Sequence, residues 1–414
     1  MLQGLLGIAV ILIVSRLFCD NNKLVRYGPV LKAFLIQVLL AFIILHFHAV
    51  QNVVDHIGNG LTALRNATLA GTSFVFGYLG GNPCPFAITP KSSTFIFAFQ
   101  ALPLVIVVSA LAMLLFHWRV LPFFVKILSR FFQPLLGIGG ALGTCSAAKL
   151  FLSQTETPLL IKPYINKLSK GELFSLMTLG MATTSGSVLV IYALILGEHV
   201  PNVMMHLISA SLINIPGAIV ISRLMVPHDL KPTDGTATQP YEFQNSLDAV
   251  YEGTSQGLNL FLNIIAAIIV FIALIYLTNS ILQSIGNLFD IKISLQIILG
   301  LIFKPLVWLM GVPWEETTQA GAILGLKTII NEMVAFEAFS KVPADALSTN
   351  ARIIMAYALC GFANLSSIGI QIATLGTIAK DRRSQVISLG FRALIAGTLA
   401  SCLSGTIVGL LMLL

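Results

Sequence analysis

Residues 150–160, LFLSQTETPLL, place Gln154, Thr155 and Glu156 consecutively inside a chain that is otherwise largely apolar. Three consecutive side chains on an α-helix point about 100° apart, so they converge on one ligand only where the backbone is unwound. Pro158 favours such unwinding, because it disfavours helix at Thr157 and has no backbone N–H to donate. We therefore expect a polar binding tip in a broken membrane segment.

The composition of the chain is that of a polytopic helical membrane protein. Of its 414 residues 56% are hydrophobic and only 10% are charged, and the mean hydropathy is +0.90. A soluble domain carries roughly 25% charged residues, and no single soluble core could bury this many apolar runs of spanning length. The net charge of +7 is distributed as membrane orientation requires, so it does not indicate a nucleic-acid partner.

Sequence motifs argue against two competing classes of protein. An intramembrane enzyme is disfavoured because the sequence contains no HExxH, no GxSxG and no GxGD-like acid pair. A passive channel would need a continuous polar pore lining, whereas the polar residues here are confined to a few segments. The five cysteines form no CxxC pair and have no histidine at metal spacing, so we expect no disulfide framework, no zinc site and no cofactor.

The apolar runs predict an all-α fold with eight transmembrane helices and several interfacial helices. The spans are expected at residues 4–18, 30–47, 95–116, 172–197, 203–226, 257–285, 351–378 and from the basic turn at 380–383 to the C-terminus. Interfacial helices are expected around 61–76, in 117–132 and within 286–315, and residues 227–256 are expected to form a cytoplasmic loop.

Two further segments are too polar in the middle to cross simply, and each fits a re-entrant hairpin. The first, 137–164, holds the tip quoted above, and the second, from about 316 to 342, holds Asn331 and Glu332. With the N-terminus outside, fifteen Lys and Arg residues fall in cytoplasmic segments and five outside, as the positive-inside rule requires. Both termini are then periplasmic, and the two hairpins enter from opposite sides.

That opposite entry predicts an inverted repeat, and the halves of the sequence echo each other. FQPL at 132–135 is echoed by FKPL at 303–306, and GMAT at 180–183 by GFAN at 361–364. Inverted repeats with broken helices that meet near the midplane are the usual construction of secondary transporters. The two polar tips should then face one another, with Asn364 and Ser367 on one helix face beside them.

The chain resembles the concentrative nucleoside transporter family, the bacterial nucleoside permeases, over essentially its whole length. The motifs that carry the resemblance are SQTETP at 153–158, INEMVAF at 330–336, CGFANLSSIGIQ at 360–371, FIFAFQALP at 95–103 and LVWLMGVPW at 306–314. The resemblance implies cation-coupled, concentrative uptake of nucleosides such as uridine or adenosine across the lipid of the bacterial inner membrane. It also implies a homotrimer in which a transport domain moves like an elevator against a scaffold.

Under this resemblance the chain divides into four parts. We expect scaffold spans at 1–116, a first transport-domain repeat at 117–226, a cytoplasmic loop with a scaffold span at 227–285, and a second transport-domain repeat at 286–414.

The family's binding residues can be carried over by position. The base-recognising tip corresponds to the three polar residues of the first hairpin, Gln154, Thr155 and Glu156. The ribose-binding set corresponds to Glu332, Asn364 and Ser367, and a wall of the pocket to Phe362. The chemistry agrees, since Gln, Thr and Glu together answer both the donors and the acceptors of a nucleobase edge.

Lys149 is the clear departure from the family pattern. Sodium-coupled members carry at this position an Asn whose oxygen helps to hold the ion, together with atoms that match Leu152, Thr183 and Thr184. A protonated lysine has no acceptor oxygen, and its ammonium could itself occupy the place of sodium, or pair with Glu156 instead. We therefore predict proton coupling, with sodium coupling as the alternative, and leave open whether a sodium site survives.

Overall fold

The computed structural model describes residues 1–20, 25–87, 94–197, 199–227, 232–236, 238 and 241–413, and every regular element in them is helical. The all-α fold class is therefore confirmed. In chain order the elements are α1 (Leu2–Leu17), α2 (Tyr27–His46), α3 (His48–Phe76), η2 (Gly77–Gly80), α4 (Phe97–Gln100), α5 (Leu104–His117), α6 (Val120–Leu136), α7 (Gly140–Ala148), η3 (Thr157–Lys167), α8 (Lys170–Ala182), α9 (Gly186–Leu196), α10 (Val203–Met225), α11 (Ser246–Asn287), α12 (Leu295–Leu309), η4 (Trp314–Glu316), α13 (Thr317–Ile329), α14 (Glu332–Ser340), α15 (Thr349–Leu359), α16 (Leu365–Ile378), η5 (Lys380–Arg382) and α17 (Arg383–Leu411).

The apolar helices correspond to the expected spans, although several are short or divided. Within the described residues, the helical stretches long and apolar enough to cross a membrane are 27–46, 97–117, 203–225, 246–287 and 380–411. The helices α1, α12 and α16 are apolar but shorter. The expected spans at 172–197 and 351–378 are each divided into two half-helices, α8 with α9 and α15 with α16.

The two divided spans are interrupted at the same place in the molecule. The backbone is extended from Thr183 to Ser185, and Asn214 of α10 donates its amide to both Ala182 O, at 2.8 Å, and Cys360 O, at 2.7 Å. A Cβ atom at Gly361 would lie 2.6 Å from Ala182 O, so only glycine permits this approach. The two breaks therefore cross, with one buried amide serving the carbonyls of both.

Buried cations elsewhere in the fold also serve the carbonyl groups at helix ends. Arg223 donates to Leu136 O at the end of α6, at 2.7 Å, and Lys327 donates to Ala358 O near the end of α15, at 2.9 Å. Arg352 donates to backbone carbonyls of the segment that follows α14. Because the last carbonyls of a helix lack intrahelical partners and carry partial negative charge, Arg223 and Lys327 stabilise helix ends, while Arg352 stabilises the turn after a helix.

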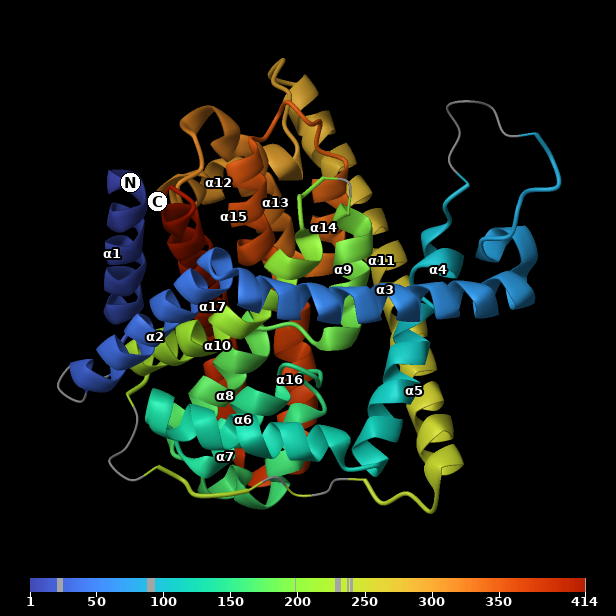
Figure 1. Ribbon diagram of the computed structural model, residues 1–414. Helices are drawn as coiled ribbons and strands as arrows, with labels where there is room; N and C mark the ends of the chain where they lie inside the picture. Colours follow the sequence, from blue (N-terminus) through green and yellow to red (C-terminus); the bar gives the residue numbers. More distant parts are fainter. Residues whose placement is uncertain are drawn as a thin grey trace.

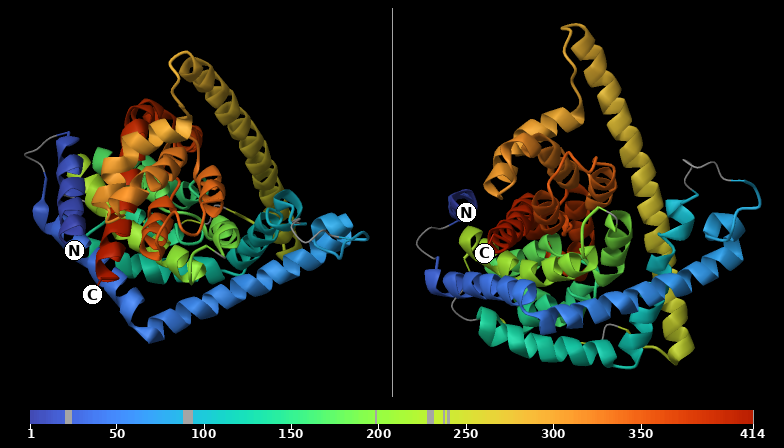
Figure 2. Two further views of the ribbon diagram at one scale, coloured as in Figure 1. Left: turned by 90° about the horizontal axis from the view of Figure 1, so that it is seen from above. Right: turned by 45° about the horizontal axis from the view of Figure 1, so that its top comes forward.

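The helices pack as two sides joined by α3. On one side α11 packs along α5, and on the other α1 and α2 pack against α10 and α17. Figure 1 shows α1 at the left edge and α11 toward the right, with α3 running across the molecule and past α11, and Figure 2 shows α1 and α11 well separated from other directions.

The same pairs of elements are in contact in the two halves of the chain. The contact of α6 with α7 has its counterpart in that of α12 with α13, and the contact of α8 with α10 in that of α15 with α17. Likewise α9 contacts α14 while α16 contacts η3, so each second half-helix meets the hairpin of the other half. Because of these contacts between the halves, both hairpins lie beside the two helix breaks.

Two of the sequence-based boundaries were wrong. The expected loop 227–256 ends early, because α11 begins at Ser246, where Asn245 accepts from Asp248 N and starts a 42-residue helix. The connection expected to hold a short helix around 61–76 instead forms α3, a continuous 29-residue helix from His48. The residues that extend α11 and α3 at their N-terminal ends are polar, so hydropathy does not predict that they are helical. Residues 88–91 of that connection, and 228–231, 237, 239 and 240 of the loop, lie outside the described residues.

Asp20, in the connection after α1, ties this connection to the core helices. Its carboxylate pairs with Lys170 at the start of α8, at 2.8 Å, and with Arg392 of α17. Burial raises the pKa of Asp20, but the hydrogen bonds and charges of the two cations outweigh it and hold the pKa below its ordinary value.

We expect Asp20→Asn to lower the apparent Tm of the purified protein by a few degrees at neutral pH. A carboxyl group whose folded pKa is depressed stabilises the fold above its unfolded pKa of about 3.9, and this stabilisation is lost as the pH falls through the folded pKa. Thermal unfolding in detergent should show the Tm difference shrinking toward about pH 3. A difference that stays constant, or equals that of Asp345→Asn at an exposed position, would contradict the assignment.

Candidate functional site

The tip of the first hairpin is unwound and held by its own side chains. Helix α7 ends at Ala148, and the chain then runs without regular helix until the 3₁₀ helix η3 begins at Thr157. Ser153 N donates to Glu156 Oε2 at 2.8 Å, the hydroxyls of Ser153 and Thr155 lie 2.8 Å apart, and Thr157 Oγ1 donates to Ser153 O at 2.8 Å. Ser153, which the sequence analysis did not single out, therefore organises the tip.

The second hairpin and the broken span α15–α16 present polar residues at helix N-termini. Asn331 caps α14 by accepting from Val334 N at 2.9 Å, and Glu332 is the first residue of that helix. Asn364 caps α16 by accepting from Ser367 N at 2.8 Å. Both hairpin and broken span thus present their polar side chains at the positive end of a helix dipole.

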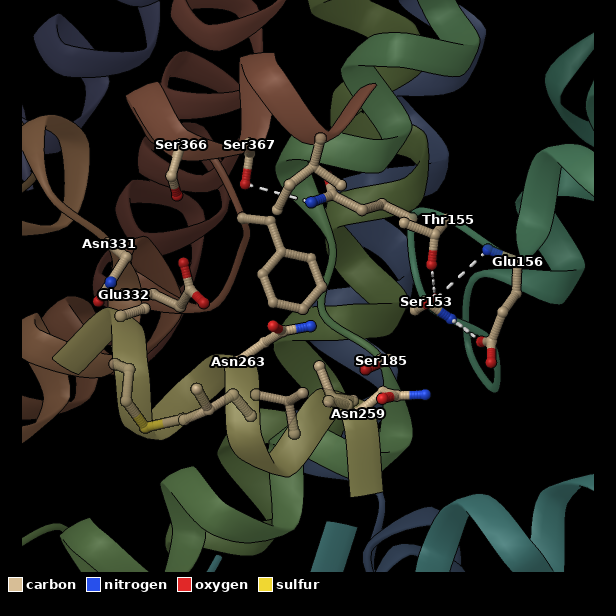
Figure 3. Close-up of a pocket in the computed structure, with 18 of the residues that line it drawn as sticks. Ser153, Thr155, Glu156, Ser185, Asn259, Asn263, Asn331, Glu332, Ser366 and Ser367 are labelled. Atoms are coloured by element: carbon tan, nitrogen blue, oxygen red, sulfur yellow. Dashed lines mark hydrogen bonds between the residues drawn. The ribbon is translucent and has the colours of Figure 1, made fainter. Parts of the chain in front are cut away.

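Hydrogen bonds join these segments across the site. Asn364 Nδ2 donates to Glu332 Oε2 at 2.6 Å, and Gln154 Nε2 donates to Ser367 Oγ at 3.3 Å. Figure 3 shows Ser367 with its bond to the first hairpin, and Glu332 and Glu156 at opposite sides of the view. The expectation that the two polar tips face one another is thus met in the geometry.

A cavity of about 590 Å³ lies between these groups. This volume is within the usual range for small-molecule sites. Its lining includes every residue that the sequence analysis assigned to substrate, namely Gln154, Thr155, Glu156, Glu332, Phe362, Asn364 and Ser367. Residues from outside the carried-over set also line it, among them Ser153, Ser185, Val188, Tyr241, Asn331 and Met333.

The long helix α11 forms a further wall of the cavity, which the sequence analysis missed. It contributes Gln256, Asn259 and Asn263, with apolar neighbours that include Leu260 and Ile264. The signal was present in the sequence, because two asparagines four residues apart share one face of a helix, but it stood inside a run that was interpreted only as an apolar span.

The residues assigned to a cation come from two separate segments and do not all bond to one another. Lys149 is 1% exposed, and its Nζ has no hydrogen-bond partner in the described part of the chain. Thr183 Oγ1 donates to Leu179 O at 2.6 Å, and the hydroxyl of Thr184 lies 3.3 Å from Cys360 Sγ. The ammonium thus makes no hydrogen bond to Leu152, Thr183 or Thr184.

Lys149 instead faces the rear of the first hairpin tip. With Gln154 and Gln371 it lines a cavity of about 10 Å³, and its Nζ lies 5.5 Å from the centre of the Phe362 ring. The Oε1 atoms of both glutamines are also buried without a partner among the described residues. One donor group and two acceptor groups therefore adjoin a space about as large as one water molecule. The Lys149 side chain therefore lies next to the base-recognising half of the site.

In this helical membrane protein, two hairpin tips and two helix breaks enclose a polar cavity. This is the construction of a secondary transporter.

Similar proteins identify the family. The descriptions "Na+ dependent nucleoside transporter N-terminus", "Nucleoside recognition" and "Na+ dependent nucleoside transporter C-terminus" match residues 6–79, 98–199 and 206–409. The uncharacterized transporter YutK of Bacillus subtilis is 35% identical over 99% of this chain and 99% of its own length. The nucleoside permease NupC of Helicobacter pylori is 31% identical over 99% of this chain and 97% of its own length.

A solved structure shares the whole fold. CNTnw in an inward-facing substrate-bound state has a TM-score of 0.90 and 33% sequence identity, covering 99% of this chain and 97% of that chain. This chain belongs to the concentrative nucleoside transporter family. The predicted family is confirmed, and with it a cation-coupled concentrative transporter of the inner membrane with many spans, not an enzyme.

We expect Glu332→Gln to lower nucleoside uptake by about 10- to 100-fold, because a hydrogen bond to a charged acceptor contributes about 1.5–3 kcal/mol. The amide retains the size of the side chain and a partner for Asn364, so the protein should remain monodisperse and folded. Initial rates in proteoliposomes, corrected for the amount of protein, measure the effect.

The matched control is Glu337→Gln, at the other end of the same helix, where the carboxylate pairs with Lys341 outside the cavity. Its uptake should stay within about twofold of wild type. Equal losses in the two variants would show that the charge of α14, and not the position of Glu332, matters.

Proposed function

We propose that this chain takes up nucleosides, uridine, adenosine or a similar one, with the base at Gln154, Thr155 and Glu156 and the ribose at Glu332, Asn364 and Ser367. The observation that carries the proposal is that these two sets, far apart in sequence, line the same cavity from opposite hairpins. Phe362 supplies an apolar wall for a planar base. Uptake assays with a panel of competing nucleosides test the proposal and settle the preference between purine and pyrimidine bases.

The ribose half has the chemistry that vicinal hydroxyls require. Glu332 Oε2 accepts from Asn364 at 2.6 Å, which fixes the carboxylate at the cavity that it lines. Glu332 is 8% exposed, so a hydrogen bond that it accepts there is little weakened by water. Ser367 Oγ can donate as well as accept, which suits a hydroxyl ligand.

The base half can serve more than one base. Gln154 has both a donor and an acceptor, and Thr155 carries a hydroxyl in the same turn. The Gln154 amide is already bonded to Ser367, at 3.3 Å, and the Asn364 amide to Glu332. A nucleoside therefore exchanges with hydrogen bonds that the site makes within itself. These two amides thus have a hydrogen-bond partner with or without the nucleoside, which limits the penalty of burying them.

We propose proton coupling, with sodium symport as the alternative. The support is Lys149, which carries a buried ammonium where sodium-coupled relatives are expected to place an oxygen ligand. Unlike Arg223, Lys327 and Arg352, it has no hydrogen-bond partner for its charge in the described part of the chain. A cation of this kind repels a second one nearby, since two unit charges about 4 Å apart interact by about 4 kcal/mol at the surface of a protein.

We propose that transport uses an elevator movement of the hairpins against a scaffold in a homotrimer. The contacts support a scaffold built on α3, α5 and α11, because α11 packs mainly along α5. The expected scaffold, residues 1–116, also included α1 and α2. These two helices pack against α10 and α17, so we assign them to the moving part, with 117–226 and 286–414. The trimer and the periplasmic termini follow from the family resemblance and the charge count.

We expect uridine accumulation to persist when choline replaces sodium, and to collapse when an uncoupler removes the proton gradient. A tethered ammonium makes a mobile sodium ion unnecessary at the site, whereas a proton gradient is still needed for concentration. Proteoliposomes with each gradient imposed separately measure this. A strong loss of uptake on sodium removal would overturn the coupling proposal and leave the nucleoside site untouched.

We expect Lys149→Asn to make uptake depend on sodium, because the variant removes the fixed charge and restores an acceptor oxygen. Initial rates should rise several-fold with external sodium in the variant and remain flat in the wild type. Lys162→Asn, on the exposed side of the same hairpin, is the control and should behave as wild type. A variant that is folded, active and indifferent to sodium would show that Lys149 does not decide the ion.

A further inference from the structure

The wall of the cavity opposite the hairpins carries a row of amides on one face of α11. Gln256, Asn259 and Asn263 line the cavity. On another face of the helix, a Cβ at Gly253 would lie 2.6 Å from Ser109 O and one at Gly257 would lie 2.7 Å from Ile106 Cα. The close contact of these glycines with α5 sets the rotation of α11. The amides are therefore turned toward the site by packing.

The amides of Asn259 and Asn263 are not used to hold the fold together. Neither side chain has a hydrogen-bond partner in the described part of the chain, whereas Gln256 donates to Glu252 at 2.9 Å. Farther along the same helix, Asn279 shows what a structural asparagine does, since it donates to Gln296 at 3.1 Å and accepts from Leu295 N at 2.8 Å. Unpaired amides in an apolar span are unfavourable unless something else pairs with them.

The two amides face different halves of the site. In the view of Figure 3, Asn263 points into the cavity on the side of Glu332, and Asn259 lies on the side of Glu156. Their spacing of four residues corresponds to about 6 Å along the helix. Asn263 thus faces the half assigned to ribose, and Asn259 the half assigned to the base.

We propose that Asn263 is a substrate-binding residue that hydrogen-bonds a ribose hydroxyl from α11, and that Asn259 does the same for the base edge. The inference rests on the proposed function of the site and extends it. The nucleoside is then held from both sides, by the hairpins and by the helix along which they move. An amide is suited to this contact, because it can donate to or accept from the same hydroxyl.

This placement makes binding depend on the transport state. A contact to α11 exists only in positions where the cavity faces these amides, so it changes the affinity of one state relative to another. As the hairpins shift by about one helical turn, a polar group of the substrate passes from one amide to the next. The ligand thereby keeps a partner along an otherwise apolar wall that includes Leu260 and Ile264.

A cycle of variants and substrate analogues tests the inference. Equilibrium binding of uridine, 2′-deoxyuridine and 3′-deoxyuridine is measured on the detergent-purified full chain, for wild type, Asn263→Ala and Asn263→Leu. Both variants should weaken uridine binding by about 5- to 10-fold, the effect of one hydrogen bond. For one of the two deoxy analogues, the same variants should change binding by less than about twofold, because the hydroxyl is already absent.

Two results would overturn the inference. One is an equal loss for all three ligands, which is the pattern of a structural defect, and the other is unchanged or tighter uridine binding in Asn263→Leu, which would make this wall an apolar barrier only. Ser280→Ala, on an exposed part of α11 where the hydroxyl only donates to Tyr276 O, is the matched control. Failure of the proposed function looks different, since wild type itself would then not bind uridine.

Discussion

The amide of Asn214 satisfies the backbone at the point where both broken helices cross. Carbonyl groups freed by a helix break inside a membrane have no water to bond and are costly to leave unpaired. A single side chain supplies both with a donor, at 2.8 Å to Ala182 O and 2.7 Å to Cys360 O, and the lack of a side chain at Gly361 lets the breaks approach. Lys327 acts alongside it on Ala358 O. Because these donors come from neighbouring helices, the side chains at the breaks remain free to face the cavity.

The site extends the same arrangement from the backbone to the side chains. Some of the polar groups placed at the cavity by a helix N-terminus or a hairpin tip have a partner from another segment, as in the pairs Asn364–Glu332 and Gln154–Ser367. Such pairs lower the free-energy cost of burying a carboxylate that has no counterion in contact with it. They also connect the segments on either side of the cavity. Binding then replaces internal hydrogen bonds by hydrogen bonds to the ligand, so the net free energy is modest and the nucleoside can leave again on the other side.

The sequence predicted best the features that interrupt an apolar chain. Polar residues in the two hairpins and in the divided spans stand out because burying them in lipid needs a reason, and Gln154 to Glu156 and Glu332 were found in this way. Features that hydropathy does not register were missed. The start of α11 at Ser246 lies in a polar stretch, where helix and loop look alike without their contacts. The role of Ser153 depends on backbone geometry, and the orientation of Asn263 depends on how Gly253 and Gly257 pack against α5, which spacing alone does not determine.

The unpaired ammonium of Lys149 bears on how a gradient can drive this cycle. A mobile cation couples transport because it binds on one side, changes the affinity for substrate and leaves on the other side. A cation tethered to the chain returns with it in every cycle, so it can shape the base-binding tip beside Gln154 but contributes no free energy from a gradient. Concentrative transport then needs another ion that is exchanged between the two sides. A proton would meet this requirement without a cage of oxygen ligands, so a lysine at position 149 is compatible with the proton coupling proposed above.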